Sequence, residues 1–498
     1  MDELLLGLDI GTSSSKGVLV CPDGEIVARA EHAHTLSLPR PGWAEHDAET
    51  TWWADAVDIC RRLTAQAPGR VMGVGVSGIG PCLLPLDADD RPLRPAILYG
   101  IDTRAAAEIE ELTALYGAEQ ILARGGSALT SQAVGPKILW LRRHEPDAWA
   151  HTRRMVMASS FLVRRLTGEY VLDHHSASQC DPLYEMGTSS WARDWADEVA
   201  PGLELPRLLW PADVAGAVHA EAAALTGIPE GTPVVAGTVD AWAEATSAGV
   251  RDPGDTMLMY GTTMFIVEVV SDFRPDRTLW GTAGVAPGSR TLAAGMSTSG
   301  ALTGWLRDLA GNPPYADLLA EAAATPRGAS GLVMLPYFAG ERTPLYDPDA
   351  RGLILGLTLA HGRGHLYRAA LEAIGYGVRH IVEALGAAGE PPRRLVAVGG
   401  GTQGGLWTSI VSDITGLRQD IPAETIGAAY GDALLAAIGT GLVPADATWA
   451  KVVRSVEPDP EARAVYDDLY DVYRSLYPAT REQAHRLAAM QRGAPGER

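Results

Sequence analysis

Short apolar runs that end at turn residues recur along the chain, and they predict β-strands. The first run, Leu4–Leu8, is followed by Asp9 and by a glycine-containing turn that begins at Gly11. Stretches with the spacing of amphipathic helices separate many of the later runs. The predicted strands of the first half are Leu4–Leu8, Val18–Cys21, Ile26–Ala30, Val71–Val76 and Pro233–Ala236, and its predicted helices are 47–63, 103–116, 136–144, 158–167 and 241–248.

The second half begins with an echo of the first. The strand predicted over 256–260 reaches Gly261, Thr262 and Thr263 and turns back over 264–270, as residues 4–20 do. The echo predicts an internal duplication in which only the first turn carries an Asp. The other strands predicted here are 332–335, 353–357 and 395–398, and the predicted helices are 364–385, 406–415, 426–438 and a surface helix near the end that frays from about residue 493.

Chain length supports a division into two domains. A chain of 498 residues is too long for one ordinary core. We therefore predict a first domain over residues 1–248, a second over 249–498, and a cleft between them.

Asp9 is the first candidate for chemistry. A carboxylate at the end of a buried strand destabilises the fold unless it has a partner such as Mg²⁺. Gly11 permits a tight turn, and the backbone N–H groups and hydroxyls of Thr12 and Ser13 suit phosphate oxygens. A solvated Asp in an ordinary hairpin is the alternative.

Three other places carry candidate chemistry. Asp240 lies between a predicted strand and a predicted helix, where it could cap the helix or act as a general base. The run Gly399, Gly400, Gly401 and Thr402 could bring backbone close to adenine or its ribose, or form a plain turn. Asp102 and Arg104 could bind sugar hydroxyls or form a surface salt pair at the start of a helix.

Composition and charge exclude several function classes. The 61 acidic and 41 basic side chains give a net charge of −20, and no dense Lys/Arg run is present that could neutralise a phosphate backbone. Nucleic acid is therefore not an expected partner. No apolar run approaches the length of about 20 residues that spans a membrane.

Cysteine usage bears on location. The four cysteines are scattered, and none belongs to a Cys-x-x-Cys pair, which predicts reduced thiols rather than a zinc or redox motif. The N-terminus is acidic and runs straight into a strand, unlike a signal peptide. We expect a cytoplasmic protein.

The chain resembles the FGGY family of carbohydrate kinases, which belong to the actin, hexokinase and Hsp70-like ATPase superfamily. The resemblance includes Gly7 to Thr12, Pro41-Gly42-Trp43, and Gly340-Glu341-Arg342-Thr343-Pro344. Its most specific part comprises Gly352–Leu357 and, after seven intervening residues, His365-Leu366 with Ala369-Ala370-Leu371-Glu372. These segments fit the family's signature throughout.

The resemblance implies a fold and a reaction. Each half should be a ribonuclease H-like α/β domain with a mixed sheet, and the protein should transfer phosphate from ATP to a sugar with Mg²⁺. Asp240 is implied as the catalytic base and a metal-site residue, and Asp9 as a residue that holds Mg²⁺ through water. The implied ATP-binding residues are Gly11, Thr12, Ser13, Gly261, Thr262, Thr263, Gly300, Gly399, Gly400, Gly401 and Thr402, and the implied substrate-binding residues are Ile79, Gly80, Asp102, Arg104 and Asp240.

Within the family, the sequence is most similar to the xylulose kinase subgroup, with two departures. Typical members carry Gln-Met-His-Gly where this chain has Ile79-Gly80-Pro81-Cys82, and they follow the base with Asn where Ala241 stands. Other acceptors therefore stay open: a ribulose, a hexulose, a deoxy sugar, a tetritol or a linear signalling dione. A nucleotide-driven binding protein of the actin or Hsp70 type is the non-enzymatic alternative, and a homodimer stays open as the assembly.

Overall fold

The structure is a computed structural model that describes residues 3–423 and 427–493. The chain divides into two units, which are described separately. Unit 1 comprises Met1–Arg251, Pro275–Thr291 and Thr425–Ala450, and unit 2 comprises Asp252–Arg274, Leu292–Glu424 and Lys451–Arg498. The first segment of unit 1 ends at Arg251, and two later segments of the chain also belong to unit 1.

Unit 1 contains the first fifteen strands and most of the short helices. Its strands are β1 (Glu3–Ile10), β2 (Ser14–Val20), β3 (Ile26–Ala33), β4 (Glu45–His46), β5 (Arg70–Gly78), β6 (Leu84–Leu86), β7 (Ala96–Ile97), β8 (Arg154–Val156), β9 (Val171–Asp173), β10 (Tyr184–Glu185), β11 (Ser190–Trp191), β12 (Arg207–Leu209), β13 (Val214–Ala217), β14 (Pro233–Val235) and β15 (Thr238–Val239), with β18 (Trp280–Ala283) from a later segment. Its helices are the π-helical η1 (Ala48–Trp53), α1 (Ala54–Thr64), α2 (Ala106–Tyr116), α3 (Ala118–Gly125), α4 (Val134–His144), α5 (Pro146–His151), α6 (Ala158–Thr167), α7 (His174–Ser178), α8 (Arg193–Val199), α9 (Ala220–Thr226), α10 (Asp240–Ser247) and α15 (Ala428–Gly439).

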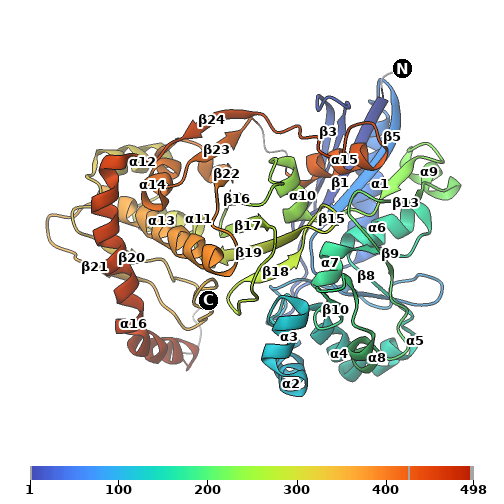
Figure 1. The fold of residues 1–498 in the computed structure, drawn as a ribbon, viewed down its shortest axis with the longest axis horizontal. Coiled ribbons are helices and arrows are strands. Elements are labelled where there is room, and N and C mark those ends of the chain that lie inside the picture. Colours follow the sequence, from blue (N-terminus) through green and yellow to red (C-terminus); the bar gives the residue numbers. More distant parts are fainter. Residues whose placement is uncertain (1–2, 424–426, 494–498) are drawn as a thin grey trace. The chain divides into compact units, whose positions relative to one another are not determined.

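The main sheet of unit 1 is mixed (Figure 1). Six strands follow the order β13-β14-β5-β1-β2-β3, and β15 adds to β5. β1 pairs antiparallel with β2 and parallel with β5, and β2 pairs antiparallel with β3. The predicted antiparallel meander is confirmed.

The two faces of this sheet pack against different apolar clusters. Every second residue of β1 from Leu4 to Ile10 belongs to one apolar cluster, whereas Leu5 belongs to a second cluster that includes α15. Because side chains alternate along a strand, Gly7 and Asp9 share the face of Leu5. Asp9 therefore lies on the face that α15 covers.

Two glycines allow α15 to lie directly on the strands. A Cβ atom on Gly7 would sit 1.9 Å from the carbonyl oxygen of Ala429, and one on Gly75 would sit 1.9 Å from that of Asp432. A side chain at either position would therefore push the helix away. Gly431 makes an equally close approach to the backbone of α10.

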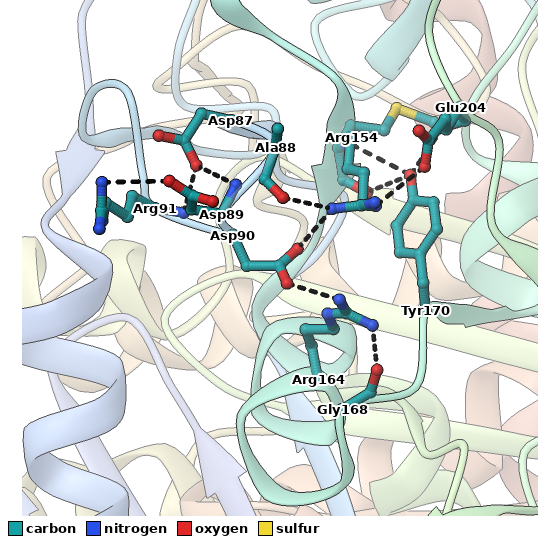
Figure 2. Close-up of polar contacts among 11 residues, drawn as sticks. Asp87, Ala88, Asp89, Asp90, Arg91, Arg154, Arg164, Gly168, Tyr170 and Glu204 are labelled. Carbon is teal, nitrogen blue, oxygen red and sulfur yellow. Dashed lines mark hydrogen bonds and ion pairs between the residues drawn. The ribbon is translucent and has the colours of Figure 1, made fainter.

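An ionic network fastens the turn after β6 to the rest of unit 1 (Figure 2). Asp90 accepts a hydrogen bond from Arg154 of β8 at 3.0 Å and pairs with Arg164 of α6. Arg154 also donates to Glu204 at 2.9 Å, and Asp87 accepts two backbone N–H groups within the turn. Each carboxylate of this surface network has a donor.

Unit 2 contains the later strands and the longest helices. Its strands are β16 (Asp255–Tyr260), β17 (Met264–Val270), β19 (Arg290–Met296), which begins in the preceding segment, β20 (Val333–Leu335), β21 (Leu353–Leu355), β22 (Arg394–Val398), β23 (Gln419–Pro422) and β24 (Val452–Val456). Its helices are α11 (Gly300–Leu309), α12 (Tyr315–Ala324), α13 (Arg363–Ala388), the 3₁₀ turn η2 (Gly400–Thr402), α14 (Leu406–Thr415), the 3₁₀ turn η3 (Pro460–Ala462) and α16 (Arg463–Gly493).

The sheet of unit 2 repeats the pairing of unit 1. Its strands include the order β17-β16-β22-β23-β24, with β16 antiparallel to β17 and parallel to β22, and with β24 antiparallel to β23. In unit 1, β2-β1-β5-β14-β13 shows the same order and the same directions. The predicted duplication is therefore present in the topology.

The predicted strands and helices are present within a few residues at each end. Asp47 caps the first helix as expected, because its Oδ1 accepts the N–H groups of Glu49 and Thr50. The predicted start of the helix at residue 426 and the fraying beyond residue 493 lie outside the described residues. The two α/β units with mixed sheets confirm the expected fold class. In the described part of the chain, none of the helices combines the length and the apolar character that crossing a membrane requires.

Candidate active site

Polar residues gather where three parallel strands of unit 1 end. Asp9 near the end of β1 is paired in register with Ser77 of β5, and Ser77 is paired with Thr238 of β15. Asp240 follows β15 directly as the first residue of α10. The carboxyl ends of parallel strands are where ligands bind in open α/β sheets.

Burial raises the pKa values of Asp9 and Asp240, and the charge of Asp9 adds to the rise at Asp240. Burial raises the pKa of Asp9 to about 6, although the Ser77 hydroxyl and the positive charge of Lys16, across from Asp9 on β2, oppose the shift. Burial, and then the charge of Asp9, raise the pKa of Asp240 well above its usual range. Asp240 Oδ1 accepts the N–H of Ala241 at 2.7 Å. The position of Asp240 is compatible with both roles considered for it, a helix cap and a general base.

Two further acids lie near this pair. Burial and the charge of Asp9 raise the pKa of Glu244, on α10, to about 7. Burial raises the pKa of Asp432, on α15, well above its ordinary value, and the charges of Asp9 and Asp240 add to the rise. Raised pKa values of this kind are typical of sites that accept or hold protons.

The turn after β1 is accessible and well ordered by hydrogen bonds. The N–H of Gly11 donates to the carbonyl of Ser14 at 3.0 Å. The hydroxyl of Thr12 lies 3.0 Å from that of Tyr99, and Ser13 is exposed.

His34, the first residue after β3, braces this turn at two points. Its backbone N–H donates to the carbonyl of Ser13 at 2.9 Å, and its Nε2 lies 3.1 Å from the carbonyl oxygen of Gly11. Its Nδ1 lies 2.7 Å from Asp55, which also accepts the hydroxyl of Ser15 at 2.7 Å. The histidine therefore ties the turn to a buried carboxylate on α1.

Ile79 and Gly80 lie beside Asp240. Ile79 continues from β5, its N–H donates to the carbonyl of Ile10 at 2.8 Å, and its side chain is buried. A Cβ atom on Gly80 would lie 2.7 Å from the Val239 side chain, which precedes Asp240. The structure thus brings these two predicted substrate residues close to the predicted base.

Asp102 and Arg104 pair with each other inside unit 1. Arg104 donates to both carboxylate oxygens of Asp102, at 2.7 and 2.9 Å, and the N–H of Ala44 donates to Asp102 at 2.7 Å. Arg104 also lies 2.8 Å from Glu45 and 3.9 Å above the ring of Trp43. The salt pair considered as an alternative is present, but it is buried rather than on the surface.

The turn of unit 2 packs against the start of α11. The N–H of Gly261 donates to the carbonyl of Thr263 at 3.2 Å, and the N–H of Gly300 donates to the carbonyl of Gly261 at 3.0 Å. The N–H of Ala301 donates to the carbonyl of Thr262 at 3.0 Å. Thr262 and Thr263 are exposed, so their hydroxyls are free to meet a ligand.

The glycine run after β22 lies against the last residue of β16. A Cβ atom on Gly399, which has φ +92°, would lie 2.7 Å from the carbonyl oxygen of Tyr260, and one on Gly401 would lie 2.8 Å from the Tyr260 side chain. Gly400 is exposed, and the Thr402 hydroxyl donates to the carbonyl of Gly399 at 2.8 Å. Unit 2 therefore brings its predicted ATP-binding residues together at the ends of two parallel strands.

The sequence did not single out four residues of the unit 1 site: Ser77, Glu244, Asp432 and His34. Ser77 and Asp432 are brought together only by the packing of α15 on β5. One signal was available, since Gly73, Gly75 and Ser77 alternate along an otherwise apolar strand. That alternation indicates a face on which another backbone approaches closely.

Two family models together match most of the chain. The N-terminal domain of the FGGY family of carbohydrate kinases matches residues 4–246, and the C-terminal domain of that family matches residues 256–440. The chain belongs to the FGGY family of carbohydrate kinases. It is therefore a phosphotransferase that uses ATP and acts on a carbohydrate, and the alternative of a non-enzymatic binding protein is set aside.

Individual kinases resemble the chain over its full length. It is 31% identical over 490 residues to xylulose kinase from Escherichia coli (strain K12), covering 95% of this chain and 98% of that protein. It is 29% identical over 488 residues to glycerol kinase from Gloeobacter violaceus, covering 96% and 97%. The crystal structure of xylulose kinase from Rhodospirillum rubrum matches with a TM-score of 0.90 and 36% identity, covering 97% and 100%. The two-domain actin and hexokinase type of fold is thereby confirmed.

Proposed function

We propose that this kinase phosphorylates a hydroxyl of xylulose or a closely related ketose, with Asp240 as the general base. The observation that carries the proposal is the carboxylate pair Asp9 and Asp240 at the ends of β1 and β15, with both pKa values raised. The names of the similar kinases support the sugar class.

Asp240 has the properties that a base for an alcohol needs. A carboxylate with a raised pKa binds a proton more strongly than an ordinary one, so it takes up the hydroxyl proton more readily once it is ionised. In the proposed reaction the sugar oxygen forms a bond to the γ-phosphorus of ATP, the bond to the β–γ bridging oxygen breaks, and the hydroxyl proton moves to Asp240. ADP carries away the electrons of the broken bond.

Mg²⁺ fits the acidic end of this site. Carboxylate oxygens are ligands that Mg²⁺ accepts, but among the residues that the structure describes no three His, Cys, Asp or Glu side chains form a group that could hold a metal. Asp9 and Asp240 would therefore hold the ion together with water and ATP, Asp9 through a water. Bound there, the ion would neutralise charge that develops on the transferred phosphate.

Both glycine-threonine turns are proposed to bind ATP. Gly11, Thr12 and Ser13 would contact phosphates in unit 1, as would Gly261–Thr263 with Gly300 in unit 2. Gly399–Thr402 would lie against the adenosine. The exposed positions of Ser13, Thr262 and Thr263, whose hydroxyls suit phosphate oxygens, support the assignment.

Ile79 and Gly80 are proposed to border the sugar. Asp102 and Arg104 would shape this region through their buried pair, since each already has partners within the protein. Apolar Ile79 and small Ala241 stand where xylulose kinases typically carry polar residues. This difference favours a second candidate, an acceptor with fewer polar groups to match, such as a tetritol or a deoxy sugar.

One assay separates these acceptors. ADP release is measured with Mg²⁺-ATP and a panel of xylulose, ribulose, a hexulose, a deoxy sugar, a tetritol, glycerol and a linear dione. We expect the highest kcat/KM with xylulose. A higher kcat/KM with another acceptor would make that acceptor, rather than xylulose, the preferred substrate. In that case Ala241→Asn should raise kcat/KM for xylulose relative to that acceptor.

The role of Asp240 has its own test. Asp240→Asn should lower kcat about 10²–10⁴-fold while leaving the affinity for ATP in place, because the variant keeps the shape but not the base. Asp213→Asn, an aspartate on an exposed turn of the same unit, is the matched control. Unchanged turnover in Asp240→Asn would contradict the role of general base and leave Asp240 with a structural role at the start of the helix.

A further inference from the structure

A hydroxyl group with a single proton lies between two carboxyl groups in unit 1. Ser77 Oγ lies 2.7 Å from Asp432 Oδ2 and 3.2 Å from Asp9 Oδ1. Ionised carboxylates only accept hydrogen bonds, and one hydroxyl donates only one. If both acids were ionised, one of the two short contacts would lack a proton.

A second proton on one of the carboxyl groups resolves this shortage. A protonated acid can donate to Ser77 Oγ, which then donates its own hydrogen to the other acid. The chain of donors runs in one direction, so the position of the extra proton decides which carboxylate stays charged.

Burial places the extra proton on Asp432. The Asp432 side chain is fully buried, whereas Asp9 is partly exposed and lies across from Lys16 in the strand register. Asp432 Oδ1 is also buried, and no donor among the described residues reaches it. An ionised Asp432 would leave part of its charge without any hydrogen bond, which is strongly unfavourable in the interior.

The surrounding charges act in the same direction. The acids whose charges act on Asp432 are Asp9 on β1 and Asp240 on α10, and burial together with these charges raises the pKa of Asp432 well above its ordinary value. A neutral Asp432 therefore relieves the repulsion within the cluster.

We propose that Asp432 is a positioning residue that stays protonated, donates to Ser77 Oγ, and thereby turns the Ser77 hydrogen toward an ionised Asp9. The hydrogen bond that Asp9 receives favours its charged form and limits its rotation. The consequence for Mg²⁺ rests on the proposed function, because it assumes that Asp9 holds the hydrated ion.

The close approach of α15 explains why this arrangement is possible. Asp432 reaches Ser77 because Gly75, on the same face of β5, leaves room for the backbone of α15 at Asp432. The residue acts through Ser77 and contacts neither the sugar nor the phosphate in this scheme.

The substitutions Asp432→Asn and Asp432→Ala separate a neutral donor from a charged group. Asparagine keeps an N–H donor toward Ser77, so Asp432→Asn should keep kcat and the half-saturating Mg²⁺ concentration within about threefold of the unmodified protein. Asp432→Ala and Ser77→Ala should each raise that Mg²⁺ concentration about tenfold or more. Asp413→Asn, which changes a buried aspartate of unit 2, is the matched control.

The double variant tests whether Asp432 acts through Ser77. Asp432→Ala with Ser77→Ala should need no more Mg²⁺ than the worse single variant, because both changes interrupt one chain. Additive effects would overturn the proposal. A loss in Asp432→Asn as large as in Asp432→Ala would also overturn it, because the residue would then act as an anion.

A second measurement does not depend on kinase activity. If Asp432 stays neutral in the fold while it ionises in the unfolded chain, its contribution to the stability of the unmodified protein falls as the pH rises above about 4. The difference in Tm between Asp432→Asn and the unmodified protein should therefore move in favour of the variant from pH 5 to pH 8. A flat difference would overturn the protonated state even if the enzyme phosphorylates its sugar. Absence of sugar-stimulated ADP release in the unmodified protein would instead overturn the proposed function and leave this test intact.

Discussion

The two glycine-threonine turns follow strands with the same pairing, but the residues that precede the two turns differ in polarity. In unit 1 the turn follows β1, which lies between β2 and β5, and in unit 2 it follows β16, which lies between β17 and β22. The second residue before each glycine is Asp9 in unit 1 and Met259 in unit 2. Topology alone therefore does not define a charged site.

The register partners extend this difference across three strands. Asp9 is paired with Lys16 and Ser77, whereas Met259 is paired with Phe265 and Val398. The duplicated strand arrangement thus includes the turn in both units, but the ionisable groups around the turn occur in unit 1. The proposed division of work follows: both turns bind phosphate, and only the first also positions metal and proton.

The largest expected effect comes from removing the charge that distinguishes the turns. Asp9→Asn should raise the Mg²⁺ requirement about 100-fold, because the neutral amide no longer holds the hydrated ion. Met259→Gln, which adds an amide at the equivalent position of unit 2, should leave the requirement unchanged. The measurement is ADP release over a Mg²⁺ series, and equal shifts in the two variants would erase the distinction between the turns.

A buried acid in unit 2 allows a test of whether burial alone identifies a functional residue. Glu268 on β17 is fully buried, neither of its carboxylate oxygens has a hydrogen-bond partner among the described residues, and burial raises its pKa to about 8 from an ordinary 4.5. Between those pH values the folded form keeps a proton that the unfolded chain releases, so stability falls as the pH rises.

Glu268→Gln should therefore stabilise the protein by about 1–3 kcal/mol near pH 8 and by little near pH 4.5. Thermal unfolding across this range measures the effect, with the exposed Glu482→Gln as control. We expect normal kinase activity in Glu268→Gln. A large loss of turnover would place a functional acid in unit 2 as well.

The two turns are also held differently. His34 braces the turn of unit 1 with its ring and backbone, whereas backbone N–H groups at the start of α11 hold the turn of unit 2. His34→Ala should lower the free energy of unfolding by about 1–2 kcal/mol and weaken ATP binding, because the Gly11 carbonyl and Asp55 each lose a partner. His32→Ala, an exposed histidine on β3, is the control for isothermal titration with ATP. Equal losses of stability and ATP affinity in the two variants would contradict the role of His34 in holding the turn.

The smallest expected effect concerns the pH profile of unit 1. The negative charge of Glu244 contributes to the raised pKa of Asp240. Glu244→Gln should lower that pKa, so the base stays ionised at lower pH and the acidic limb of kcat/KM moves down by about half a pH unit. Glu221→Gln, an exposed residue of α9, should leave the limb in place. A shift upward in Glu244→Gln would reverse the assigned sign.

Much of the fold and part of the site followed from local pattern. The alternation and turn chemistry of residues 4–30 predict the meander, and Asp47 predicts the start of the first helix, because both depend on neighbours in sequence. The echo at residues 256–270 predicts the duplication. Asp9 stands out because it directly follows an apolar strand, and Asp240 because it lies between a predicted strand and a predicted helix.

The sequence by itself therefore determined the strand and helix pattern, the repeated turn, the family resemblance and the two principal carboxylates. Only the tertiary structure decided that α15, almost two hundred residues after Asp240, returns to unit 1 and brings Asp432 to Ser77. It also decided that Asp102 and Arg104 satisfy each other in the interior. The physical reason is the same in both cases: partners far apart in sequence meet through backbone approach and burial, and no local pattern of residue types encodes which ones they will be.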